Sequence, residues 1–282
     1  MKHILNTYNS LGDLSKYLAG DSINPLFKGC TYLSSERKDD KGKKFTSTSS
    51  FDEADDLMKY GDKKNAKKLN AALKISAPAF GVMNKKRPFN DVWGFIPNVG
   101  AALAGDPLNM IMFKNIPAQK KVITIIFDRS VDHTIKTTEI VDASARLINA
   151  IIALENAGKR VNLFILGGFA NAYKDNADEA FLVLTKIKDS GSIFDKQKLA
   201  YTLLNPSFHR RHMFKCLEKN DEGLKDSAFY EHYGYPVKKG CTEKILKDKH
   251  FPYDALFTFY DIRYKKDEDI KDMIEANKSA VK

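Results

Sequence analysis

Cysteine is scarce in this sequence. Only three occur among 282 residues, and they are far apart: Cys30, Cys216 and Cys241. An odd number of widely spaced cysteines fits neither a disulfide framework nor a cysteine-rich zinc site. We therefore expect a reducing, intracellular setting and no disulfide-linked partner. Long apolar runs are also missing, because polar residues such as Thr124 interrupt each run before the roughly 20 residues that a membrane-spanning helix needs. We expect no membrane partner.

Several catalytic motifs are absent as well. The segment GGFANAY at 167–173 lacks the Lys and the Ser or Thr of a phosphate-binding P-loop, and no G-x-G-x-x-G leads from a predicted strand into a helix. There is no G-x-S-x-G nucleophile elbow. His232 and His250 flank Cys241 at a spacing that matches no zinc pattern. These absences favour a protein that is not an enzyme.

Positive charge, in contrast, is abundant. The chain has 46 Lys and Arg against 36 Asp and Glu, which gives a formal net charge of +10. Attraction to nucleic acid is therefore plausible, although most of the lysines are mixed with acidic residues, as on an ordinary solvated surface. The 43% hydrophobic content indicates a folded core.

The clearest structural pattern lies between residues 122 and 170. Val122–Phe127 is an apolar run typical of a strand buried on both faces, and Val161–Leu166 is a second. Between them, apolar residues recur at helical spacing from Thr138 to Asn156, and Gly158 supplies a stop. This pattern predicts a strand–helix–strand unit of two parallel strands. In such sheets the ligand site lies beyond the carboxyl ends of the strands, where Asp128 falls.

Further strands are predicted at Ala180–Ile187, as an antiparallel edge strand, and at Asp254–Asp261. The predicted fold is therefore α/β, with a Rossmann-like, mostly parallel sheet flanked by helices. We place this domain at residues 118–282. Residues 1–117 are predicted to form an N-terminal helical and irregular extension. Its apolar but Pro- and Gly-rich stretch at 91–112, which holds the only tryptophan, is expected to pack against the core.

Local signals predict shorter elements. Residues 1–21 are compatible with a helix, 34–50 with a surface loop or hairpin, and 266–280 with a terminal helix. Ser50 is expected to cap a helix that ends at Tyr60, and a second helix is expected from Lys63 to Lys74. Two more helices are predicted at 195–204 and 207–218.

Acidic and hydroxyl side chains gather after the first buried strand, in the turn IIFDRSVD at 125–132. Asp128, Ser130 and Asp132 lie in this turn, and Asp261 ends the last predicted strand. If the two strands are parallel neighbours, these oxygens face one crevice and suit Mg²⁺, Mn²⁺ or Ca²⁺. In the alternative, the acidic turn only caps the following helix.

The turn and the order of elements around it resemble a von Willebrand factor A domain, whose metal-ion-dependent adhesion site uses an Asp-x-Ser-x-Ser turn with a later Thr and Asp. The resemblance implies Asp128, Ser130 and Asp261 as ligands of a divalent cation. The family's second serine falls at Asp132, and Thr202 is the candidate for its threonine. Such intracellular domains act as interaction modules in larger assemblies, often beside AAA-type ATPases, so the resemblance implies a protein partner.

Two other segments, at 91–107 and 203–214, resemble uncharacterised proteins of bacteriophages and related mobile elements. This second resemblance implies the cytoplasm of a bacterial host as the location, with packaging in a virion as a further option.

A basic cluster, FHRRHMF at 208–214, supports a different function. Arg210 and Arg211 suit phosphate recognition, and with His209, His212 and the flanking aromatic residues they could contact nucleic acid. The alternative is that these side chains fill polar gaps inside the fold. A third function, a metal-dependent nuclease or phosphoesterase, would use Asp128, Asp132 and Asp261 to hold the ion.

Overall fold

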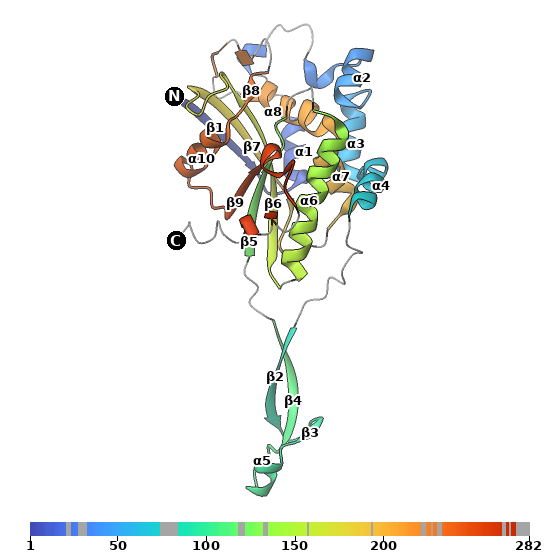
Figure 1. The fold of residues 1–282 in the computed structure, drawn as a ribbon, viewed down its shortest axis with the longest axis vertical. Coiled ribbons are helices and arrows are strands. Elements are labelled where there is room, and N and C mark those ends of the chain that lie inside the picture. The colour runs from blue at the N-terminus through green and yellow to red at the C-terminus, as the bar shows by residue number, and fades with distance from the viewer. Residues whose placement is uncertain are drawn as a thin grey trace. The chain divides into compact units, whose positions relative to one another are not determined.

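The computed structural model describes residues 1–20, 24–27, 33–73, 84–117, 122–131, 135–156, 158–192, 194–220, 224–226, 228–229, 233–266, 269–270 and 272–274. The chain divides into two compact units (Figure 1). The larger combines residues 1–76 with 122–282, and the smaller consists of residues 77–121. The smaller unit is therefore an insertion within the sequence of the larger one.

The larger unit is built on a mixed sheet in the order β1-β7-β6-β5-β9, with β8 paired to β6. Its strands are β1 (Lys2–Tyr8), β5 (Val122–Asp128), β6 (Arg160–Ala170), β7 (Glu179–Lys188), β8 (Tyr235–Pro236) and β9 (Ala255–Thr258). The pairs β1–β7, β5–β6 and β5–β9 are parallel, and β6–β7 is antiparallel. The predicted α/β class with a mostly parallel sheet is thus confirmed, and so is the reversed direction of the third predicted strand. Its predicted place at the sheet edge is wrong, because β1 pairs with β7 on its outer side.

Helices cover this sheet. The longest is α6 (Thr137–Asn156), which connects β5 to β6 as predicted. Gly158 ends its course with a φ of +81°, a conformation that other residues adopt only at a cost. The others are α1 (Leu11–Ala19), α2 (Asp40–Thr46), α3 (Phe51–Tyr60), α4 (Lys63–Ala72), α7 (Lys196–Leu204), α8 (Phe214–Lys219), α10 (Lys239–Asp248) and α11 (Phe259–Ile262). Single turns of tighter helix are η1 (Pro25–Phe27) and η2 (Ser34–Glu36).

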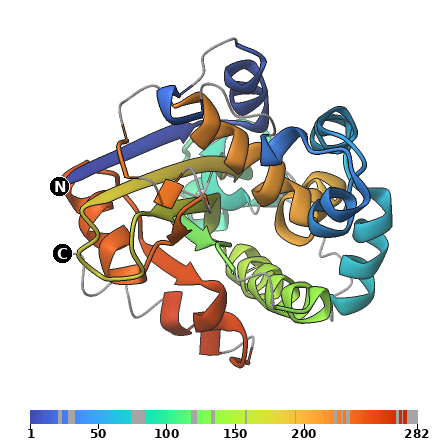
Figure 2. The same ribbon diagram turned by 90° about the horizontal axis from the view of Figure 1, so that it is seen from above.

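Helices lie on both faces of the sheet (Figure 2), and side chains are buried on both faces. Alternate side chains of β6 and β7 pack against α10 in one cluster, which includes Leu166, Leu182, Cys241 and Ile245. On β5 the burial is continuous, because Ile125, Ile126 and Phe127 are all inaccessible to solvent. A central strand covered on both faces explains the uninterrupted apolar run in the sequence.

The predicted division of the larger unit is wrong. Residues 1–76 are not an extension, because β1 pairs in parallel with β7 from Lys2 opposite Glu179 to Tyr8 opposite Thr185. The strand replaces a predicted helix, which begins only at Leu11 after the cap Ser10. The predicted loop at 34–50 also contains η2 and α2. The helices capped by Ser50 and Asp195 are confirmed, whereas most of the predicted helix at 266–280 lies outside the described residues.

The smaller unit is a twisted antiparallel hairpin. Its strands β2 (Asn84–Asp91) and β4 (Met110–Pro117) pair along their whole length, and β3 (Ile96–Pro97) adds to β4. A short helix, α5 (Val99–Leu103), follows β3. The prediction that residues 91–112 pack against the core is wrong, since Trp93, Phe95 and Leu103 are largely exposed. Among the described helices of the whole chain, none is long and apolar enough to cross a membrane.

Candidate functional site

Asp128 lies where the parallel neighbours β5 and β9 end, beside the continuing strand β6. It is the last residue of β5, and it stands in register opposite Leu166 of β6 and Thr258 of β9. The sequence-based expectation that the strands beginning at Val122 and Asp254 are parallel neighbours is therefore correct. Because the carboxyl ends of parallel strands meet at one edge, side chains from β5 and from the turn after β9 are brought to the same part of the molecule.

The Asp128 carboxylate is almost fully enclosed, with only 3% of the residue exposed. Its Oδ1 accepts a hydrogen bond from the Ser130 backbone N–H (2.8 Å), and the Ser130 Oγ in turn accepts one from the Gly168 N–H (3.0 Å). Burial raises the pKa of Asp128 to about 7, against the lowering effect of Ser130, and the nearby charge of Asp261 raises it further. Among the described residues, no basic side chain compensates the charge of this carboxylate.

Asp261 belongs to the short helix α11, which follows β9, rather than to the strand itself. It closes a capping box at the start of α11: the Thr258 Oγ1 accepts from the Asp261 N–H (3.2 Å), and the Asp261 Oδ2 accepts from the Thr258 N–H (2.8 Å). Lys239, at the first position of α10, contacts the same Oδ2 at 3.0 Å. The predicted partner of Asp128 is thus present, but an ammonium group already compensates part of its charge.

The predictions for the other metal ligands differ in their outcomes. Ser130 lies beside Asp128 as predicted. Asp132 lies outside the described residues. Thr202 was a candidate for the missing threonine, but its hydroxyl is buried within α7 and donates to the carbonyls of Lys198 (3.0 Å) and Leu199 (3.2 Å). Thr202 is therefore not placed to reach an ion at the strand ends. Among the described residues, no cluster of three or more His, Cys, Asp or Glu could hold a metal.

Sequence reasoning missed Arg129, which is as buried as its neighbour Asp128. Its Nη1 donates to the carbonyls of Thr202 (3.0 Å) and Asn205 (2.8 Å), at the carboxyl end of α7. A cation at the negative end of a helix dipole is stabilised there, although burial still lowers the pKa of Arg129. This side chain anchors the turn after β5 to α7. A single arginine between Asp and Ser carries no sequence signal for such a role.

The basic cluster at 208–214 forms a π-helical segment, η3 (Phe208–Met213), and most of it faces inward. Arg211 is fully buried. Its guanidinium donates to the backbone carbonyls of Ser35 (2.7 Å), Arg37 (3.0 Å) and Thr48 (2.8 Å) and to the Thr48 Oγ1 (2.7 Å). The prediction that Arg210 and Arg211 together present a phosphate-binding surface is therefore wrong for Arg211, whose donors are used to hold the segment before α3.

The other members of the cluster also make internal contacts. Arg210 is partly exposed, lies 4.1 Å from the centre of the Phe45 ring and donates to the Phe45 carbonyl (2.6 Å). His212 is buried, with its Nδ1 2.9 Å from the Tyr201 hydroxyl, and burial lowers the pKa of His212 to about 3. His209 stacks on Phe169. These positions match the alternative that the cluster fills polar gaps in the fold.

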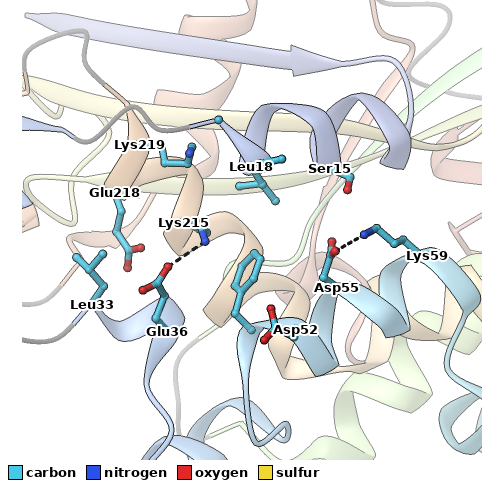
Figure 3. A pocket seen from close by; sticks show the side chains of 13 residues that line it. Ser15, Leu18, Leu33, Glu36, Asp52, Asp55, Lys59, Lys215, Glu218 and Lys219 are labelled. Carbon is cyan, nitrogen blue, oxygen red and sulfur yellow. Dashed lines mark hydrogen bonds and ion pairs between the residues drawn. The ribbon is translucent and has the colours of Figure 1, made fainter.

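A pocket of about 620 Å³ lies elsewhere, among α1, α3, η2 and α8 (Figure 3). Four of its charged side chains form two ion pairs: Lys215 contacts Glu36 at 3.0 Å, and Lys59 contacts Asp55 at 2.6 Å. Glu218, at its wall, accepts from the Tyr233 hydroxyl (2.6 Å). This balance of charge favours no particular ligand. The edge around Asp128 is the stronger candidate, because no basic side chain of the described residues compensates the Asp128 carboxylate.

Comparison with known proteins gives one match. The family model described as "Domain of unknown function (DUF7192)" matches residues 1–278. Neither the curated proteins nor the solved structures contain a significant match.

Proposed function

Because the chain belongs to the DUF7192 family, whose description states no activity, we propose its function from the carboxyl edge of the sheet: a non-enzymatic interaction module for a protein partner in a larger assembly. The observation that carries the proposal is the buried Asp128 carboxylate, whose pKa burial raises to about 7. Ionisable groups that are costly to bury are concentrated at functional sites. A bound cation, or a cationic group of a partner, would offset the free-energy cost of burying the charged Asp128 carboxylate.

The arrangement of elements supports the resemblance to a von Willebrand factor A domain. The order β5, α6, β6, antiparallel β7 and a later strand, β9, beside β5 is the order on which that resemblance rests. On the resemblance to phage-encoded proteins, we propose the cytoplasm of a bacterial host as the location of the module, with packaging in a virion as a further option.

The residues at this edge fit a hard divalent cation such as Mg²⁺ or Mn²⁺ in part. Asp128, Ser130 and Asp261 offer two carboxylates and a hydroxyl, which are donors of the right chemistry. Lys239, however, lies against Asp261 and would compete with the ion. We propose a weak site in which a divalent cation, when bound, screens Asp128 and Asp261 and offers a remaining coordination position to a carboxylate of the partner.

Competition with Lys239 gives a direct test. Replacement Lys239→Met is expected to tighten Mg²⁺ and Mn²⁺ binding by roughly 3- to 10-fold, because it removes a positive charge in contact with a ligand carboxylate. Asp128→Asn is expected to abolish binding. Isothermal titration calorimetry of the metals alone into each variant measures both effects.

The neighbouring residue supplies the control. Lys238→Met removes the same charge, but Lys238 interacts with Asp175 and the Tyr173 ring instead of Asp261, so little change is expected. Equal effects of the two lysine variants, or unchanged binding in Asp128→Asn, would contradict the cation site. Metal-dependent cleavage of nucleic acid that Asp128→Asn eliminates would instead favour a nuclease.

A further inference from the structure

The end of the smaller unit remote from its termini is apolar and exposed. The segment from Val92 to Gly105, here called the apolar tip, contains no ionisable residue. Its large side chains are strongly exposed: 70% for Trp93, 78% for Phe95 and 85% for Leu103, with Val92, Ile96 and Val99 also exposed. They come from the turn after β2, from β3 and from α5. Soluble proteins seldom expose contiguous apolar patches of this kind unless something binds them.

The apolar tip satisfies much of its own backbone hydrogen bonding. The N–H of Phe95 donates to the carbonyl of Ile111 (3.0 Å), and the N–H of Asn98 donates to that of Asn109 (2.7 Å). At the start of α5, the Asn98 side chain accepts from the Ala101 N–H (3.3 Å). Each backbone N–H or C=O group without a hydrogen bond costs several kcal/mol when it is transferred from water to hydrocarbon. This cost normally keeps irregular chain segments in water. Transfer of this tip into an apolar phase is correspondingly less costly.

Charged residues lie on both sides of the apolar tip. Asp91 precedes it and Asp106 follows it, and each carboxylate accepts a hydrogen bond within its own turn, from the N–H of Val92 (2.7 Å) and of Leu108 (2.8 Å) respectively. The charge therefore stays at the boundary of the segment. Its interior can enter an apolar phase without the burial of a charge.

The strands behind the tip carry basic residues. Lys85, Lys86 and Arg87 belong to β2, and Arg87 is in register with Lys114 of β4. At about 3.3 Å per residue, Arg87 lies roughly 13 Å along the strand from Asp91. Amphipathic elements bury their apolar side about 5–10 Å into the boundary between headgroups and acyl chains, and basic residues are attracted to anionic lipids over about 10 Å. The apolar tip therefore corresponds to the acyl region of a bilayer. The four basic residues of β2 and β4, which outnumber the two aspartates at the boundary of the tip, correspond to the anionic headgroups.

We propose that the apolar tip inserts into the surface of a bilayer that contains anionic phospholipids. The charge complementarity of β2 and β4 favours a lipid surface over an apolar pocket of another protein. The expectation of no membrane partner rested on the lack of a spanning helix, whereas insertion of a hairpin end requires no span. This surface lies in the smaller unit, so the proposal does not depend on the Asp128 site.

Trp93 is the only tryptophan of the chain and therefore reports on the tip alone. The full-length protein is mixed with vesicles of phosphatidylcholine, with or without added phosphatidylglycerol. A shift of the tryptophan emission to shorter wavelength is expected with the anionic vesicles, together with quenching by brominated acyl chains. Added salt should weaken the binding, because part of the attraction is electrostatic.

Two double variants distinguish vesicle binding through the apolar tip from nonspecific adsorption of the protein. Phe95→Ser/Leu103→Ser keeps the reporter and is expected to lower vesicle binding at least ~10-fold, because it removes two apolar anchors. Tyr60→Ser/Tyr264→Ser changes two residues of similar exposure, 76% and 79%, in the larger unit and should leave binding unchanged. Vesicle flotation measures the binding of each.

Three results would overturn the proposal. The first is that none of the vesicles changes the fluorescence emission of Trp93. The second is an equal loss of binding in both double variants. The third is an emission shift that grows with protein concentration without lipid, which would mean that a second copy of the chain covers the tip.

Discussion

Replacement Arg211→Met is expected to lower the free energy of unfolding by about 3–5 kcal/mol. The guanidinium is fully buried and supplies four hydrogen bonds to Ser35, Arg37 and Thr48. Methionine fills a similar volume but donates none, so the buried carbonyls of Ser35 and Thr48, the buried Thr48 hydroxyl and the partly buried carbonyl of Arg37 each lose a partner. Each unsatisfied group costs about 1–3 kcal/mol. Equilibrium unfolding in urea, with an unchanged dependence on denaturant, measures the loss.

Arg210→Met is the matched control. The same chemical change one residue earlier removes a partly exposed side chain that stacks on Phe45 and donates to its carbonyl. An effect of about 1 kcal/mol or less is expected. If both variants retained full stability and lost nucleic-acid binding equally, the two arginines would instead form the surface that the sequence alone suggested.

The sequence predicts the central strands well because their burial is a local pattern. Ile125, Ile126 and Phe127 are buried on both faces, which leaves an apolar run that needs no knowledge of their neighbours. The helix between the strands and its end at Gly158 follow from spacing and backbone conformation alone. Asp128 was also predictable, because the carboxyl end of a buried parallel strand is a general location for sites.

Features that depend on distant residues were not predictable. The partners of Arg211 lie between 163 and 176 positions earlier in the sequence. The segment HRRH at 209–212 is therefore equally compatible with a surface position and with an interior position. Strand β1 alternates polar and apolar residues weakly, and only pairing with β7 decides its structure. Trp93 was expected in a core because large apolar side chains are usually buried, whereas here they lie on an inserted hairpin.

Asp128→Asn is expected to stabilise the protein at pH 8 by about 4 kcal/mol when no divalent cation is present. Burial raises the pKa of Asp128 to about 7, whereas the ordinary pKa of an aspartate side chain is 3.8. Between about pH 4 and 7 the folded protein retains a proton that the unfolded chain releases, so the stability of the wild type falls as the pH rises. Asparagine keeps the shape of the side chain and carries no charge.

The pH profile distinguishes this effect from ordinary repacking. Near pH 4 the wild-type carboxyl is protonated in the folded state, so the difference between wild type and variant should become small. Asp142→Asn, at an exposed position of α6, should change little at either pH. A variant that is less stable than wild type at pH 8 would mean that the Asp128 carboxylate is a structural group that already has adequate partners.

The most direct test of the proposed site is the effect of Mg²⁺ on the unfolding temperature of wild type and Asp128→Asn at pH 8. A ligand that binds only the folded state raises its stability, and here it would also remove the cost of the buried charge. We predict that Mg²⁺ raises the unfolding temperature of the wild type and leaves that of Asp128→Asn unchanged. No change in the wild type, or the same increase in both proteins, would contradict a cation at the carboxyl edge of the sheet.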